Sequence, residues 1–198
     1  MMNINVIKQV VLASQSPRRV ALLKQIGIDC IVMPADIDET VFTGEAPTDY
    51  VLRLAKQKAQ VIMEKHLTNN LPILAADTTV ALGLKILGKP ESDTDAFNML
   101  TQLSGSRHQV HTAIAVALNG KLETMLNTTQ VEMMSLSDAM IEAYIASGEH
   151  RDKAGSYAIQ GLAAQWIKKI TGSYTGVMGL PLYETAKLLR DFQDKSPN

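Results

Sequence analysis

Apolar and polar positions follow two different periods along the chain, and each period predicts one type of element. Apolar residues that are consecutive or alternate predict strands at residues 9–13, 28–33, 71–82, 84–87, 109–118, 122–134 and 166–170. Apolar residues that recur every three to four positions predict helices at 17–27, 48–66, 93–103, 137–148 and 181–192, and the acidic stretch 36–45 is expected to be a loop.

Local signals mark several of the expected boundaries. Ser16 is placed to cap the first helix with Pro17 at its first position, and Thr48 or Asp49 is placed to cap the second helix, which ends near His66. The pair 119–120 (Asn-Gly) predicts a tight hairpin between two long strands. Strands alternate with helices but also form hairpins, so we expect an α/β fold with a mixed, twisted sheet and flanking helices.

Composition and charge narrow the class of protein. The 198 residues, 46% of them apolar and 20% charged, have the balance of a soluble globular protein, and we expect one domain over residues 1–198. The formal net charge of −1 gives no bulk attraction to nucleic acid or anionic membranes. The single cysteine, Cys30, excludes an intrachain disulfide, and neither a signal peptide nor an uninterrupted apolar span is apparent. We therefore expect a cytoplasmic protein with no nucleic-acid or membrane partner.

The start of the first helix is a candidate anion site. Arg18 and Arg19 lie in the first turn, where the helix dipole already places about half a positive charge and disfavours cations. A bound phosphate would compensate, because Ser14, Ser16, free backbone N–H groups and two guanidinium groups all offer donors there. The alternative is that both arginines are solvated or pair with nearby acidic residues.

Asp77 is the second candidate. It follows a run of small and apolar residues and is either a general base, a metal ligand or a cap of the following turn. We expect the active cleft where the first strand-to-helix turn meets the end of the strand that carries Asp77.

Lys89 lies in the sequence GLKILGKP at 83–90, which differs from the P-loop pattern at one residue. Pro90 replaces the hydroxyl residue of a true P-loop, but Lys89 can still reach a phosphate. His108 and His111 lie three apart on a strand, point to opposite faces and are expected to be structural.

Several motifs together resemble the Maf family of nucleoside triphosphate pyrophosphatases over nearly the whole chain. They are ASQSPRR at 13–19, LAAD with the following threonine at 74–78, GKP at 88–90, SGSRHQVHTA at 104–113, DKAGSYAIQG at 152–161 and GSYTGVMGLPL at 172–182. The resemblance implies metal-assisted hydrolysis of a nucleoside triphosphate to the monophosphate and pyrophosphate, with a role in sanitising nucleotide pools or restraining cell division. It also implies two lobes around a cleft, similar to the inosine triphosphatase fold, and a homodimer.

The resemblance also assigns roles by position. The base that activates water falls on Asp77, an acidic residue that binds the metal falls on Glu39, with Asp36 and Asp38 as open alternatives, and the metal is a divalent cation, Mg²⁺ being expected. Basic and polar cleft residues fall on Ser14, Arg18, Arg19, Lys58 and Lys89.

The same resemblance indicates the substrate. The sequence IQG at 159–161, with Arg18 and Thr78, resembles the branch that acts on dTTP and UTP, and the Gln160 amide can match the donor and acceptor of uracil or thymine. Two alternatives stay open: a 7-methyl-GTP pyrophosphatase, and a regulator of division that senses a nucleotide without cleaving it.

Overall fold

A seven-stranded mixed sheet forms the centre of the protein in the computed structural model, which describes residues 7–65 and 70–194. The strands are β1 (Gln9–Leu12), β2 (Asp29–Val32), β3 (Ile73–Leu82), β4 (Lys85–Leu87), β5 (Arg107–Leu118), β6 (Lys121–Met133) and β7 (Ile167–Thr171). They are ordered β2-β1-β3-β5-β6-β7, and β4 pairs with β3. β1 runs parallel to β2 and β3, and all the other pairs are antiparallel. The predicted α/β class with a mixed sheet is confirmed.

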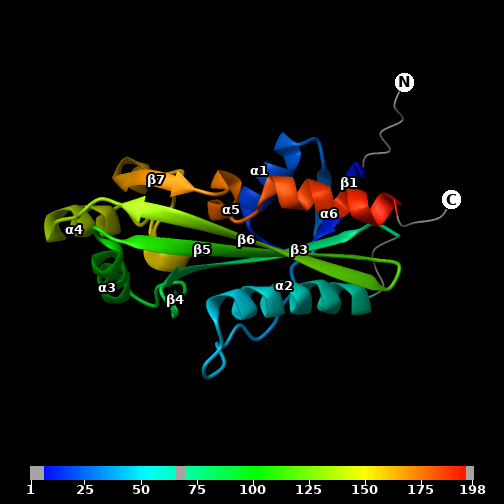
Figure 1. The fold of residues 1–198 in the computed structure, drawn as a ribbon, viewed down its shortest axis with the longest axis horizontal. Helices are drawn as coiled ribbons and strands as arrows, with labels where there is room; N and C mark the ends of the chain where they lie inside the picture. The colour runs from blue at the N-terminus through cyan, green and yellow to red at the C-terminus, as the bar shows by residue number, and fades with distance from the viewer. Residues whose placement is uncertain (1–6, 66–69, 195–198) are drawn as a thin grey trace.

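The hairpin of β5 and β6 forms the long axis of the sheet (Figure 1). Asn119 and Gly120 connect the two strands, and both have positive φ, of 50° and 75°. A two-residue turn with positive φ at both positions matches the right-handed twist of the strands it joins, which explains why Asn-Gly predicted this hairpin.

Helices cover both faces of one end of the sheet. Helices α1 (Pro17–Gln25) and α6 (Leu182–Asp194) lie on one face, and α2 (Pro47–Glu64) lies on the other (Figure 1). Successive residues of β1 point to opposite faces, so Val10 packs with the apolar side chains of α1 and α6 while Val11 packs with those of α2. The amphipathic patterns of these helices therefore serve two separate layers of core.

The other end of the sheet carries its own core. Helices α3 (Asp93–Leu103) and α4 (Asp138–Ala146) gather there with β4 and β7 (Figure 1). Leu100, Ile141 and Trp166 belong to a third apolar cluster, distinct from the two at the first end. β3, β5 and β6 run through both ends, and the molecule therefore has the two expected lobes.

The structure corrects several predicted boundaries. α2 begins at Pro47 rather than after Thr48 or Asp49, because proline is well suited to the first helical position. Its predicted end, His66, lies outside the described residues. Ser16 does precede α1, but its side chain makes no capping hydrogen bond.

Three short helical segments were not predicted. They are 3₁₀ turns at Ala154–Ser156 and Leu162–Trp166, and α5 (Tyr174–Val177). Each is too short to show a helical repeat in the sequence. No helix within residues 7–65 and 70–194 has the length and apolar character needed to cross a membrane.

Candidate active site

A gap at one edge of β3 creates the cleft. Along this edge of β3, β1 pairs only at Ile73 and Leu74, and β4 pairs from Val80 onwards. In the sheet as described, residues 75–79 of β3 therefore have no strand neighbour on that side, while β5 pairs along the other. A cavity of about 840 Å³ opens there, between the β1–α1 turn and the second lobe. Its size is typical of a small-molecule site.

The position of Asp77 differs in one respect from expectation. Asp77 does meet the β1–α1 turn, as predicted, but it lies in the middle of β3 rather than at the end of a strand. The reason is that β3 continues beyond the end of β1 into the second lobe. The apolar run before Asp77 ends within the stretch of β3 that has no β1 neighbour, not at the end of the strand.

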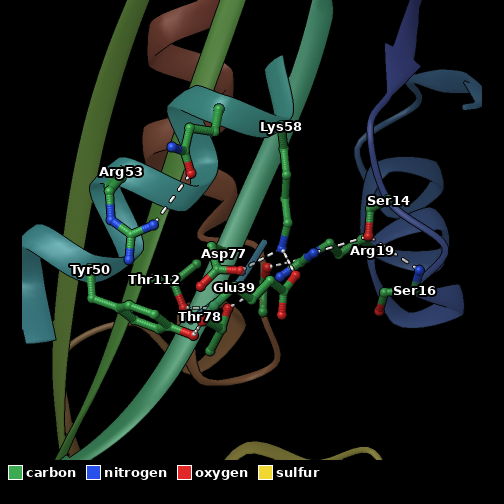
Figure 2. Close-up of polar contacts among 12 residues, drawn as sticks. Ser14, Ser16, Arg19, Glu39, Tyr50, Arg53, Lys58, Asp77, Thr78 and Thr112 are labelled. Carbon is green, nitrogen blue, oxygen red and sulfur yellow. Dashed lines mark hydrogen bonds and ion pairs between the residues drawn. The ribbon is translucent and has the colours of Figure 1, made fainter. Parts of the chain in front are cut away.

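Two carboxylates share one ammonium group at this gap (Figure 2). The Nζ of Lys58 lies 2.7 Å from Oδ1 of Asp77 and 2.6 Å from Oε1 of Glu39. Asp77 and Lys58 are buried, whereas the side chain of Glu39 is 45% exposed. Lys58 comes from α2, and Glu39 comes from the loop that precedes this helix.

Burial and charge act in opposite directions on the two acids. Burial raises the pKa of Asp77 above its usual value, and the positive charges of Lys58 and Arg19 only partly offset this effect. Partial burial would also raise the pKa of Glu39, but its hydrogen bond with Lys58 and the surrounding positive charges lower it overall. Asp77 is thus the stronger proton acceptor of the pair.

Arg19 is fixed by neutral acceptors rather than by a carboxylate. Its Nε donates to the carbonyl of Gly179 at 2.8 Å, and its Nη1 donates to Oγ of Ser14 at 2.9 Å. Its Nη2 lies 3.4 Å from Oγ1 of Thr78, which is itself 2.9 Å from Oγ1 of Thr112 (Figure 2). Burial lowers the pKa of Arg19, and the charge of Asp77 opposes this. These contacts hold the positive charge in place without neutralising it.

Three further cations line the same cavity: Arg18, Lys89 and Lys153. Within residues 7–65 and 70–194, none of the three forms an ion pair. Burial, with the charges of Arg18 and Lys89, lowers the pKa of Lys153, whose Nζ donates to the carbonyl of Arg151 at 3.1 Å. Three positive side chains without a neutralising partner in the described part of the chain favour the binding of a polyanion in this cavity.

Lys153 is a cleft residue that sequence reasoning missed. It lies in the polar loop between α4 and the first 3₁₀ turn, and its sequence signal is its place in the DKAGSYAIQG motif, seven residues before Gln160.

Gln160 lines the cavity too, is exposed and has no hydrogen-bond partner within the described part of the chain. Ser16 lines the cavity, and its backbone N–H donates to Oγ of Ser14 at 3.2 Å.

Other candidates lie apart from the cleft. Asp36 and Asp38 do not line the cavity, and the carboxylate of Asp38 instead accepts from the backbone and hydroxyl of Thr40. His108 contacts the hydroxyl of Tyr157 at 2.8 Å, and His111 contacts Oγ1 of Thr128 at 2.9 Å. The structure thus brings Glu39, and neither of the other two acids, to Lys58.

The described residues contain no cluster of three or more His, Cys, Asp or Glu side chains placed to hold a metal. The oxygen donors that converge in the cleft are the carboxylates of Glu39 and Asp77. One or two carboxylates, completed by substrate oxygens and water, are the donor set that Mg²⁺ commonly takes. These residues therefore fit a hard divalent cation bound together with a phosphate ligand, and they do not form a complete cage.

The fold and the cleft together define a two-lobed α/β protein whose cavity is lined by the carboxylates of Glu39 and Asp77 and by cations that form no ion pair among the described residues. The chain belongs to the Maf family: the family model described as "Maf-like protein" matches residues 9–192. The family expected from the sequence motifs is confirmed.

Curated relatives cover almost the whole chain. A protein of Methylobacillus flagellatus is 56% identical over 96% of this chain and 95% of its own length, and a protein of Pseudoalteromonas atlantica is 50% identical over 90% of this chain and 94% of its own. Both are named dTTP/UTP pyrophosphatase. Among solved structures, the Ham1 protein of Staphylococcus aureus is 19% identical and covers 64% of this chain and 72% of its own, with a TM-score of 0.41.

Proposed function

We propose that this protein hydrolyses dTTP and UTP to the nucleoside monophosphate and pyrophosphate. The names of its relatives support the reaction and the substrates. One structural observation carries the proposal: a buried carboxylate, Asp77, shares a cavity with cations that have no acidic partner in the described part of the chain. A base and several positive groups in one cavity suit water attack on a polyphosphate.

Asp77 is the proposed base. It takes a proton from a water molecule whose oxygen forms a bond to the α-phosphorus, while the bond between that phosphorus and the bridging oxygen to the β-phosphate breaks. Pyrophosphate leaves with the electrons of the broken bond, and no covalent intermediate with the protein is needed. The burial that raises the pKa of Asp77 makes it a better proton acceptor near neutral pH than an exposed aspartate.

The cations bind the triphosphate in this proposal. Arg19 is already oriented by Gly179, Ser14 and Thr78, so little reorganisation is required when phosphate oxygens arrive. Arg18 belongs to the same helix start, where the backbone N–H groups also favour an anion. Lys89 and Lys153, together with the polar groups of Ser14 and Ser16, complete the proposed binding residues.

Glu39 is the proposed ligand of a divalent cation, for which Mg²⁺ fits the oxygen donors. When bound, such a cation supplies neutralisation of the negative charge on the phosphate oxygens. Lys58 holds the carboxylate of Glu39 beside that of Asp77, and thus orients both acids towards the same region of the cleft.

Gln160 is proposed to read the base. Its exposed amide offers one donor and one acceptor, which match the N3–H and O4 of uracil or thymine. Thr78, which also lines the cavity, is proposed to contact the substrate as well. A site built on these hydrogen bonds discriminates against bases that leave its polar groups unpaired.

The test is pyrophosphate release by the purified protein with Mg²⁺, measured for UTP, dTTP, CTP, GTP and 7-methyl-GTP. We expect the highest kcat/KM for UTP and dTTP and a loss of about 10²–10⁴-fold in Asp77→Asn. Asp29→Asn, an exposed aspartate at the start of β2, is the control and should retain full activity. Nucleotide binding without pyrophosphate release would show a sensor instead, and a preference for 7-methyl-GTP would overturn the substrate assignment.

A further inference from the structure

The segment 36–45, which carries Glu39 into the cleft, has little apolar anchoring of its own. Val41 is 43% exposed and Phe42 is 55% exposed, and Ile37 is only partly buried and belongs to none of the three core clusters. Glu39 nevertheless reaches Lys58 at 2.6 Å, so its backbone must be held close to α2. Because no apolar side chain of residues 36–45 is fully buried, polar interactions supply much of that restraint.

Arg53 of α2 supplies the contacts to this segment. Its Nε lies 2.6 Å from Oε1 of Glu45 and its Nη2 lies 2.7 Å from Oε2, a two-pronged ion pair. The same Nη2 donates to the backbone carbonyl of Thr40 at 3.0 Å, and the guanidinium carbon lies 3.9 Å from the centre of the Phe42 ring. One side chain thus binds the segment at three residues, which follow Glu39 within six positions.

The ion pair is sheltered and stays charged. The side chains of Arg53 and Glu45 are 17% and 8% exposed. The hydrogen bonds from Arg53 hold the pKa of Glu45 below its usual range. The carboxylate of Glu45 also accepts from the backbone N–H of Phe42 at 3.1 Å, which closes a turn in the segment.

The residues that hold the segment share one side of α2. Tyr50, Arg53 and Gln57 are spaced by three and four positions, which places them along one face of a helix. The Tyr50 hydroxyl donates to the backbone carbonyl of Glu39 at 3.0 Å (Figure 2). Nη1 of Arg53 lies 3.4 Å from Oε1 of Gln57. Lys58, which binds the Glu39 carboxylate, follows on the next position. The same helix therefore sets both the backbone and the side chain of Glu39.

We propose that Arg53 is a positioning residue that, through Glu45 and Thr40, clasps segment 36–45 to α2 and thereby holds the Glu39 carboxylate at Lys58. This inference rests on the proposed function, in which Glu39 acts in the cleft. Arg53 itself does not line the cavity, so it acts on the reaction only through the segment.

The first part of the test measures the clasp without using activity. Amide hydrogen exchange over residues 36–46, and cleavage by chymotrypsin after Phe42, should both accelerate in Arg53→Ala and in Glu45→Gln. Arg53→Lys should resemble Arg53→Ala, because lysine keeps the charge but not the fork or the stacked plane. Arg107→Ala, which removes an exposed ion pair with Glu132 on the sheet, is the matched control and should leave the segment unchanged. Unchanged exchange in Arg53→Ala would overturn the clasp.

The second part asks whether the clasp acts through Glu39. Arg53→Ala should lower kcat for UTP by roughly 10- to 100-fold, the size of effect seen when the support of a metal-binding residue is removed. In a Glu39→Gln background the same Arg53 substitution should cause little further loss, because the group that it positions is already disabled. Independent losses that multiply, or faster exchange with unchanged kcat, would overturn the positioning role.

The failures of the two proposals are distinguishable. If the wild-type protein releases no pyrophosphate from any nucleotide, the proposed function fails while the exchange measurement still decides the clasp. If wild-type activity is normal and Glu39→Gln is fully active, Glu39 has no role in turnover and the positioning of that role is refuted.

Discussion

Lys58→Met should destabilise the protein far more than substitution of either acid that Lys58 contacts. Methionine keeps the length and apolar stem of lysine but leaves the buried Asp77 and the neighbouring Glu39 without their shared cation. Removing one partner of a buried ion pair costs about 3–5 kcal/mol. For a chain of this length, each kcal/mol lowers Tm by about 2–4 °C, so the expected fall is roughly 6–20 °C.

The reverse substitutions should cost less, because Lys58 keeps a partner in each. In Asp77→Asn the ammonium group still contacts Glu39 at 2.6 Å, and the new amide oxygen can accept a hydrogen bond, so we expect a loss of about 1 kcal/mol. In Glu39→Gln the lost partner is 45% exposed, and we expect less than about 1 kcal/mol. The asymmetry follows from one cation that serves two acids.

The pH dependence of stability provides a second test of the Lys58→Met prediction. Burial already raises the pKa of Asp77, and loss of the Lys58 charge raises it further. At this site the folded variant then binds more protons than the unfolded chain in mildly acidic solution, so its stability deficit relative to wild type shrinks as pH falls from 7 towards 4. Urea titrations of wild type and the three variants at pH 7 and 5, without added metal, measure this. A Lys58→Met protein as stable as wild type at pH 7, or a deficit that grows on acidification, would refute the reasoning.

Three further predictions concern other parts of the structure. Lys153→Met should raise KM for UTP about tenfold with little change in kcat, because a charged contact to phosphate is lost. If steady-state kinetics show an unchanged KM, Lys153 does not bind the triphosphate. Gly155→Ala should lower the free energy of unfolding, measured by chemical denaturation, by about 1–3 kcal/mol. The φ of 67° at Gly155 disfavours a side chain, and a Cβ there would come within 2.9 Å of Val80. An alanine variant as stable as wild type would contradict this. Burial lowers the pKa of His108 to about 4. Between pH 6.5 and 4 the unfolded chain therefore binds a proton that the folded protein does not, and stability falls on acidification. The expected loss is up to about 3 kcal/mol, at about 1.36 kcal/mol per pH unit. Denaturation midpoints across that range should lose this slope in His108→Gln, and an identical slope in both proteins would show that His108 is not its source.

Much of the fold was predictable because its signals are local. The alternation of apolar residues gave the strands, and Asn119 with Gly120 gave the hairpin, since a turn with positive φ depends on those two residues alone. The start of α2 was misplaced because two polar caps and Pro47 compete within three positions, and the structure uses the proline. Segments such as α5 are held by tertiary contacts and leave no periodic signal.

The candidate site was less accessible to sequence reasoning. Asp77 and the arginines of the helix start stand out by their chemistry, but Lys58 entered only through the family resemblance. Nothing local indicates that Lys58 joins two acids from different segments, or that Arg19 is fixed by Gly179, 160 positions away. Such contacts depend on how β3 and α2 are placed in the completed fold.

The stretch of β3 without a strand neighbour also bears on self-association. An exposed strand edge is a template on which another chain can pair, and proteins protect such edges by keeping them short, covering them or placing a charge that points inward. Residues 75–79 combine these devices, because the open stretch is five residues long, is recessed between the two lobes and carries the buried charge of Asp77. An incoming strand would have to enter the cleft and lie beside that carboxylate. The cleft that holds the proposed base thus leaves only a short, recessed strand edge on which another chain could pair.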